Sequence, residues 1–317
     1  MSMRLRIASR PSKLALLQAT LVKHEILAVA PQLEVVIVAI KTTGDRLTRG
    51  PLADAGGKGL FVRELEQALL AGEADIAVHS MKDLPGVTPA QYRIAAVPPR
   101  ENPSDVIVSR RGGIDSLRQG ARVGTASPRR KFELLDTRPD LRIDLLRGNV
   151  DTRLGKLAAG EFDAIVLAAA GLKRMGVLSA PPDGLLIEEL SEDRFVPAGG
   201  QGALAIEALV GSPIADSHEI EALITGLNQK RAHCETSAER SFLATIGASC
   251  NSPVGAHGAL IGDRLLLRAV LFSLDGRRKI QDTASAPIGD HTDAVKLGIA
   301  LAKQMLAAGA GDLIRSA

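Results

Sequence analysis

A thiol, a set of arginines and one carboxylate are the residues whose types and positions favour chemistry. Cys250 lies in a run of small residues, 247–256, between a helix-like segment and an apolar run. It therefore belongs to a connecting turn, where a thiol is accessible. Taken alone, such a cysteine is more often a small buried hydrophobe than a functional group. The rest of the chain must decide between these interpretations.

Cationic and hydroxyl side chains follow most of the predicted strands. In open α/β sheets, ligands bind beyond the carboxyl ends of the strands, where helix N-termini offer free N–H groups. Guanidinium groups there favour a ligand with several carboxylates, because each fork pairs with a carboxylate through two hydrogen bonds. Any single arginine is more simply a solvated surface residue, but the set coincides with the ligand edge of both predicted sheets. The positions are Arg10, Ser12, residues 80–83, 127–130 and 147–149, Arg153, Lys173 and Arg174.

Asp83 is an acid beside Lys82 at the end of a predicted strand, among many cations. A carboxylate there would stabilise a developing positive charge and move a proton to or from an amine or ring nitrogen. An N-cap or turn aspartate is the simpler alternative. His79 closes a buried strand and is more simply structural than a general base. Cys234 lies within a helical stretch, where we expect it to be packed.

The composition bounds the class of protein. The chain has 317 residues, 45% hydrophobic and 24% charged, which predicts two or three folded domains. The net charge of +3 is small, so anion affinity must come from local placement. Aromatic residues make up only 2%, too few for a base-stacking surface, so we expect no nucleic-acid partner. Two cysteines form neither a disulfide framework nor a cysteine-rich zinc site, and we expect no metal.

We expect a cytoplasmic protein with no membrane partner. The first residues lack the apolar core of a signal peptide. No segment approaches the roughly 18 continuous apolar residues of a membrane span.

Strands alternate with helices in two successive blocks, which predicts parallel sheets and an α/β fold. Glycine-rich passages at 44–59 and 196–202 are predicted as a mobile loop and a hinge. From about Ser217 the pattern changes to helices followed by strands, which predicts a smaller α+β domain. The predicted domains are 1–98 with 197–217, 99–196, and 218–317. The predicted strands are 4–9, 33–40, 74–79, 106–109, 122–125, 142–146, 164–168, 254–261, 264–272 and 279–284, and the main helices are 12–30, 60–71, 126–135 with its entry turn, 150–159 and 292–308.

A set of motifs, in their order and spacing, resembles the porphobilinogen deaminase family of tetrapyrrole synthesis. The similarity runs from about Arg6 to near the C-terminus. Each motif alone is weak, and the ordered set is highly specific. Departures from the family pattern at Lys13, Ala126 and 248–249 remove no charged or catalytic group. The motifs are GGKGLF at 56–61, DIAVHSMKD at 75–83, LRGNV at 146–150, AGLKR at 170–174, GQGA at 200–203 and the Cys250 turn.

The resemblance implies two doubly wound α/β domains, similar to type II periplasmic binding proteins, and a C-terminal α+β domain with a three-stranded sheet. It implies a monomeric transferase of porphyrin and heme synthesis. The family condenses four porphobilinogen molecules head to tail, releases ammonia, and frees linear hydroxymethylbilane by hydrolysis. Growth takes place on a dipyrromethane cofactor, built from substrate units and held by a thioether. Each pyrrole unit carries two carboxylates, which suits many cations.

The resemblance also implies roles for individual residues. Cys250 is the implied attachment point of the cofactor. Asp83 is the implied catalytic acid, which assists loss of the amine and stabilises cationic pyrrole intermediates. Phe61 falls where a family aromatic stacks near the growing chain. The other implied cofactor- and substrate-binding residues are Arg10, Ser12, Lys58, Lys82, Thr125, Ser127, Arg129, Arg130, Arg147, Arg153 and Arg174.

Two other functions remain open on the sequence. A solute-binding module of two α/β lobes joined by a hinge explains the arginines, but neither a third domain nor an accessible Cys250. A thiol enzyme with Cys250 as nucleophile on an acyl substrate needs a nearby base, for which His257 is the candidate. Pyrrole units bound covalently to the protein would distinguish the function implied by the family resemblance from these two alternatives.

Overall fold

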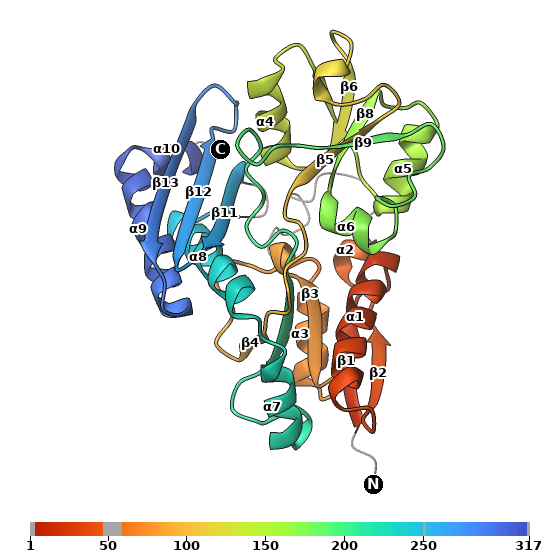
Figure 1. Cartoon of the computed structure of the whole chain (residues 1–317), viewed down its shortest axis with the longest axis vertical. Coiled ribbons are helices and arrows are strands. Elements are labelled where there is room, and N and C mark those ends of the chain that lie inside the picture. Colours follow the sequence, from red (N-terminus) through yellow and green to blue (C-terminus); the bar gives the residue numbers. More distant parts are fainter. Residues whose placement is uncertain (1–3, 47–58, 250–251, 316–317) are drawn as a thin grey trace.

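The computed structural model describes residues 4–46, 59–249 and 252–315. Within these residues the chain forms two five-stranded sheets and one three-stranded sheet, with helices packed on each (Figure 1). Figure 1 places the first sheet in the lower part, the second in the upper part and the C-terminal sheet at the left. No helix in the described ranges is long and apolar enough to cross a membrane.

The first sheet has the strand order β2-β1-β3-β10-β4 and is covered on both faces. Leu5 and Ile7 on β1 pack with helices α1 and α7, whereas Ala8 packs with α3. Because successive strand residues point to opposite faces, these contacts place the helices on opposite sides of the sheet. The elements are β1 (Arg4–Ser9), α1 (Lys13–Val29), β2 (Glu34–Ala39), α2 (Thr43–Arg46), α3 (Arg63–Leu70), β3 (Ile76–Ser80), β4 (Tyr92–Ala96), β10 (Leu204–Leu209) and α7 (His218–Gly226).

The second sheet has the order β7-β6-β8-β5-β9 and is also doubly wound. Val106 and Val108 on β5 face the core under α5 and α6, and Ile107 faces the core under α4. The predicted α/β class is therefore confirmed for both sheets. The elements are β5 (Asp105–Ser109), β6 (Arg122–Thr125), α4 (Pro128–Thr137), β7 (Arg142–Leu145), α5 (Val150–Ala158), β8 (Ala164–Ala168), α6 (Ala169–Arg174) and β9 (Leu186–Glu189).

The predicted parallel pairing is present in both sheets, between β1 and its neighbours β2 and β3 and between β6 and its neighbours β7 and β8, and each sheet also contains one antiparallel strand. β10 runs against β3 and β4 in the first sheet, and β5 runs against β8 and β9 in the second. Both strands follow a crossing of the chain between the sheets. The first crossover, 97–104, leads from β4 to β5, and the second crossover, 190–203, leads from β9 to β10. The predicted hinge at 196–202 lies within the second crossover.

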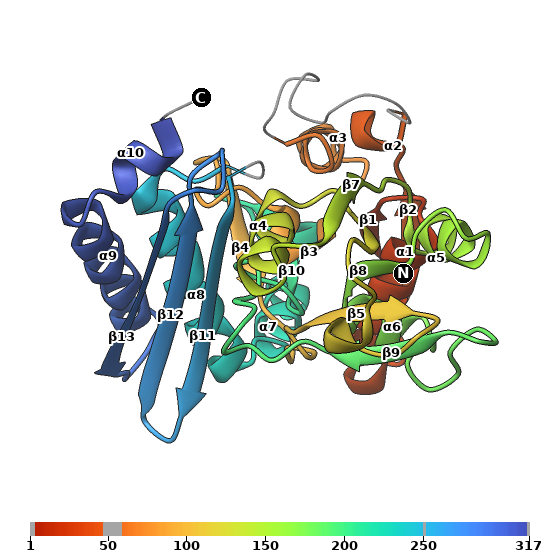
Figure 2. The ribbon, with the colours of Figure 1, turned by 90° about the horizontal axis from the view of Figure 1, so that it is seen from above.

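The C-terminal unit contains the predicted sheet of three strands, and the structure shows that they pair antiparallel. Helices α8 and α9 cover one face, and α4 of the second sheet packs on the other (Figure 2). On that second face the rings of Phe132 and Phe272 stack at 6.0 Å. Cys250 follows α8 and precedes β11 in the sequence, outside the described residues. The elements are α8 (Lys230–Ile246), β11 (Val254–Ile261), β12 (Arg264–Phe272), β13 (Lys279–Pro287), α9 (His291–Ala307) and α10 (Ala310–Arg315).

Close packing of α9 on α8 depends on Gly298. A Cβ there would overlap the Ala238 carbonyl and the Ser241 hydroxyl on α8. We expect Gly298→Ala to destabilise the protein by about 1–3 kcal/mol, since overpacking forces the helices apart. Gly155→Ala, at an exposed position of α5 with nothing near its added Cβ, should be neutral or stabilising by about 0.5–1 kcal/mol. Urea unfolding of both variants checks this, and equal midpoints would contradict it.

Candidate active site

The turn after β3 positions Lys82 and Asp83. A short 3₁₀ helix (Met81–Asp83) directly follows the buried strand. Its first residue, Met81, is buried and its N–H donates to the Ala203 carbonyl of the second crossover at 3.0 Å. Lys82 Nζ donates to Gln201 Oε1 at 3.2 Å. The turn is therefore fixed against the crossover, and both Lys82 and Asp83 remain half-buried.

Several cations from both sheets lie close to this turn. Burial and the charge of Arg130 lower the pKa of Lys82 to about 8, and Asp83 opposes the shift. Burial and the charges of Arg130 and Arg147 likewise lower the pKa of Arg153 to about 10, and Asp83 again opposes it. Charges that shift one another in this way are close in space. We call Lys82, Arg130, Arg147 and Arg153 the cation cluster; Asp83 lies among them.

Two members of the cation cluster have no carboxylate partner within the described part of the chain. Arg147 follows β7, and its buried Nε atom has no hydrogen-bond partner. Arg153 lies in the first turn of α5 and donates only to the Gly148 carbonyl, at 2.7 Å. Asn149 caps this helix by accepting from the Thr152 N–H. A buried donor without a partner, beside repelling cations, favours the binding of an anion here.

Arg129 and Arg130 are instead engaged inside the protein. Both are buried in the first turn of α4 and pair with Asp105, at 2.8 Å and 2.7 Å. Arg129 also contacts Glu133 at 2.7 Å and donates to the Val196 carbonyl. Burial alone would raise the pKa of Asp105, but the two guanidinium charges outweigh burial and hold it far below its usual value. The structure thus uses both arginines to join α4 to β5.

Arg10 and Phe61 lie together on the first sheet. The guanidinium of Arg10 stacks over the Phe61 ring, 4.1 Å from its centroid, and forms an ion pair with Asp45. The ring packs directly on Gly44, where any Cβ would overlap it. The ring of Phe61, predicted to stack near the growing chain, therefore has the Arg10 guanidinium stacked on it. Lys58, also predicted to bind ligand, lies outside the described residues.

The remaining predicted residues contact backbone. Ser12 caps α1 by accepting from the Ala15 N–H, and Ser127 caps α4 by accepting from the Arg130 N–H. Both serines are half-buried. Thr125 Oγ1 accepts from the Ser127 N–H at 3.2 Å. Arg174, at the end of α6, donates to the Gly202 carbonyl at 2.8 Å, and burial lowers its pKa. Arg174 is therefore tied to the second crossover.

The two histidines considered in the sequence have carboxylate partners. His79 Nε2 lies 3.0 Å from Glu207 on β10, and both side chains are buried, in keeping with a structural role. His257 contacts Glu192 at 3.0 Å and Glu239 at 3.5 Å. Burial alone would lower the pKa of His257, but these carboxylates raise it to about 9. A charged imidazole is a poor general base, which opposes the thiol-enzyme alternative.

The sequence did not single out Asp105 or the side chain of Gln201, which connect the site. Gln201 is buried, donates to Asp105 at 2.8 Å and accepts from Lys82 and Arg130. An aspartate at the start of an apolar strand, and a glutamine between glycines, were the available signals. Among the described residues, no group of three metal-ligating side chains could hold a metal ion.

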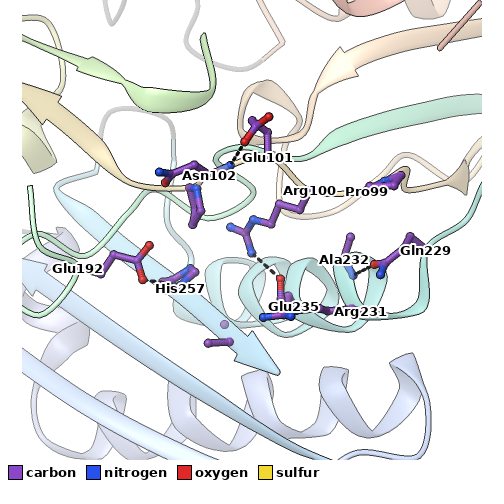
Figure 3. A pocket seen from close by; sticks show the side chains of 13 residues that line it. Pro99, Arg100, Glu101, Asn102, Glu192, Gln229, Arg231, Ala232, Glu235 and His257 are labelled. Atoms are coloured by element: carbon purple, nitrogen blue, oxygen red, sulfur yellow. Dashed lines mark hydrogen bonds and ion pairs between the residues drawn. The ribbon is translucent and has the colours of Figure 1, made fainter. Parts of the chain in front are cut away.

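No member of the cation cluster lines either of two cavities in the protein. One, of about 380 Å³, lies between the first crossover, α8 and β11, and no predicted site residue lines it (Figure 3). The other, of about 350 Å³, is lined by Thr125 and Ser127 together with apolar residues such as Phe132. The predicted site is thus a cluster of charges.

Two doubly wound sheets thus bring cations and one carboxylate together, an arrangement that suits a ligand with several carboxylates. The family model "Porphobilinogen deaminase, dipyromethane cofactor binding domain" matches residues 5–214, and "Porphobilinogen deaminase, C-terminal domain" matches 232–307. The porphobilinogen deaminase of Trichlorobacter lovleyi is 44% identical over 96% of this chain and 94% of that one. That of Roseiflexus sp. is 45% identical over 99% of each. The chain belongs to the porphobilinogen deaminase family.

Solved structures of lower similarity include periplasmic binding domains. The periplasmic VFT2 domain of Bordetella pertussis BvgS is 16% identical, with a TM-score of 0.39, over 71% of this chain and 86% of that one. An ancestral arginine-binding protein is 16% identical, with a TM-score of 0.36, over 72% of this chain and 91% of that one.

Removal of the Asp105 charge tests the buried connection between α4 and β5. We expect Asp105→Asn to destabilise the protein by about 3–5 kcal/mol, because two buried guanidinium groups lose their shared carboxylate. Asp144→Asn breaks the exposed pair of Asp144 with Arg122 and should cost under about 1 kcal/mol. Denaturant midpoints measure both effects. Similar losses in the two variants would contradict the assignment.

Proposed function

We propose that the cation cluster holds the carboxylates of the cofactor and the growing chain, and that Asp83 is the acid of the reaction. The protein is a hydroxymethylbilane synthase, a transferase that condenses four porphobilinogen molecules head to tail with release of ammonia. Hydrolysis then frees linear hydroxymethylbilane. The observation that carries the assignment of residues is that Arg147 and Arg153, which have no carboxylate partner among the described residues, lie in one charge cluster with Asp83.

The residues present fit a dipyrromethane cofactor. Its two pyrrole units carry four carboxylates, which suit the unpartnered Nε of Arg147 and the guanidinium of Arg153, which among the described residues donates only to a backbone carbonyl. When bound, the cofactor supplies the terminal pyrrole to which each substrate unit is added. We assign its thioether to Cys250, which follows α8 in the sequence. The nearby cations would neutralise the carboxylates of the cofactor in a partly buried setting, where ion pairs are strong.

Each residue of the site has a role that follows from its surroundings. In this proposal Asp83 passes a proton to the departing amine and stabilises positive charge on a pyrrole. Lys82 has a pKa of about 8, so a bound carboxylate would favour its charged form. Arg10, stacked on Phe61, offers a flat cationic surface beside the first sheet.

Other proposed binding residues act through backbone or buried contacts. Ser12, Thr125 and Ser127 shape the starts of α1 and α4, and Arg174 fixes the second crossover. Arg129 supports Arg130 through Asp105. Lys58 completes the set by family resemblance.

We also propose the larger organisation of the protein. The domains are 1–98 with 197–217, 99–196 and 218–317, which places both crossovers at domain boundaries. The protein acts as a cytoplasmic monomer on porphobilinogen. Motion about the crossovers would accommodate the lengthening chain.

Intact mass tests the cofactor assignment. We expect the purified protein to exceed its sequence mass by two pyrrole units, and Cys250→Ser to lose both the adduct and the activity, because the thioether requires the sulfur atom. Cys234→Ala is the matched control, since Cys234 is buried in α8 and burial raises the pKa of its thiol. That variant should keep the adduct. An active protein without added mass would exclude a bound primer.

Asp83→Asn tests the proposed acid. The variant should fold and retain the adduct, while porphobilinogen turnover falls about 10²- to 10³-fold, because an amide cannot transfer the proton. Asp151→Asn, an exposed carboxylate on α5 paired with Lys13, should keep normal turnover. Initial rates of porphobilinogen consumption, with intact mass measured on the same samples, decide the matter. Near-normal turnover of Asp83→Asn would remove Asp83 from its role.

A further inference from the structure

One buried ionic cluster, not used by the chemistry above, fastens the C-terminal unit to both crossovers. Its centre is the carboxylate of Glu239 on α8, which is 0% exposed. Arg100 of the first crossover donates to its two oxygens, at 2.8 and 3.1 Å. The N–H groups of Gly200 in the second crossover and Gly258 on β11 donate to the same carboxylate, at 2.6 and 2.7 Å. Both crossovers and β11 therefore meet on α8.

His257 on β11 extends this cluster to a second carboxylate. Its Nε2 atom lies 3.0 Å from Glu192 Oε2 in the second crossover, and its Nδ1 atom lies 3.5 Å from Glu239 Oε1. The side chain of His257 is 12% exposed and forms part of the wall of the 380 Å³ cavity, where Figure 3 shows its contact with Glu192. One imidazole thus bridges α8 and the crossover.

Carboxylates near both nitrogens of this ring favour its charged form. Nε2 lies 3.0 Å from Glu192, whereas Nδ1 has no hydrogen-bond partner and meets Glu239 only as an ion pair at 3.5 Å. Burial alone would lower the pKa of His257, but the two carboxylates raise it to about 9. The charged groups around the ring are Glu192 and Asp193 of the second crossover, Arg100 of the first, Glu235 and Glu239 of α8, and Arg268 of β12.

The backbone beside His257 runs along the second crossover. The N–H of Ala256 donates to the Pro197 carbonyl at 2.9 Å, and Arg268 of the neighbouring strand contacts Asp193 at 2.6 Å. Gly255 approaches the Val196 carbonyl so closely that a Cβ would overlap it. Strand β11 is therefore docked on the crossover over several residues, and His257 supplies the charge at this contact.

Given the proposed function, we infer that His257 is a positioning residue, whose imidazolium locks β11 and α8, the elements that flank Cys250 in the sequence, onto the second crossover. Loss of its proton leaves Glu192 without a cationic partner and loosens this side of the joint. Turnover then falls, because the segment assigned to hold the primer is less well fixed relative to Asp83. The inference rests on the proposed function only for its effect on turnover.

Unfolding as a function of pH tests the joint directly. A group whose pKa rises on folding contributes stability below its unfolded pKa and loses it as pH rises through its folded pKa. For His257 that window lies between its ordinary value of 6.5 and about 9. The melting temperature of the wild type should therefore fall across the window more steeply than that of His257→Gln, whose amide does not titrate. His218→Gln, an exposed histidine on α7, should follow the wild type.

Kinetics test positioning separately from stability. In adduct-bearing protein at neutral pH, His257→Gln should lower kcat at least about threefold, with KM for porphobilinogen within about twofold, as expected when placement rather than binding is lost. Glu192→Gln keeps the shape of the joint and removes one carboxylate. It should move the alkaline loss of turnover to lower pH, and it decides the matter if His257→Gln does not fold.

Three results would overturn the inference: equal pH slopes of melting in wild type and His257→Gln, a wild-type kcat in His257→Gln at every pH, or an unshifted pH profile in Glu192→Gln. The failure of the proposed function looks different. In that case the wild type carries no pyrrole adduct, while the melting difference still reports on the joint.

Discussion

The second crossover is an irregular segment that is buried over most of residues 195–203. Irregular backbone normally lies at the surface, because its polar groups find few partners in the interior. Here charged side chains from surrounding elements serve as those partners. The contacts are Arg129 with the Val196 carbonyl, Arg100 with the Gln201 carbonyl, Arg174 with the Gly202 carbonyl, and Glu239 with the Gly200 N–H. A single strip of backbone thus joins both sheets to the C-terminal unit, and the catalytic turn rests against it through the Met81 N–H.

The arginines divide into two groups by their partners. Arg129 and Arg130 share the buried carboxylate of Asp105, so their charges are compensated within the protein. Arg147 and Arg153 lack such a partner in the part of the chain that the structure describes, and burial together with repulsion by Arg130 and Arg147 lowers the pKa of Arg153. Buried charges are tolerated only when paired. A polycarboxylate therefore relieves an electrostatic cost that the folded protein alone bears, which favours retention of a bound anion through many cycles of reaction.

Much of this arrangement could be predicted from the sequence, and the failures have physical causes. Apolar runs predicted the central strands, and the rule that parallel strand ends meet at one edge identified Lys82, Asp83 and Arg153. Strand β10 was missed because its buried Glu207 breaks the apolar pattern, and its partner His79 lies 128 residues away. The sequence did not distinguish arginines that have a carboxylate partner from those that have none, because such partners lie far away in the chain. Glycines predicted a flexible passage at 196–202, but they did not indicate that most of this passage is buried, because the burying side chains come from distant segments.

The chain leaves the first sheet after β4 and returns to it only at β10, which affects the order in which the sheets can form during synthesis. Strand β4 pairs only with β10 in the described structure, and β10 is made more than a hundred residues later. The second sheet, in contrast, is built from the contiguous strands β5 to β9. Because chains emerge from the ribosome N-terminus first, the second sheet is complete before the first can close. The N-terminal part of the protein thus waits for later residues, with β4 and one side of β3 unpaired in the meantime.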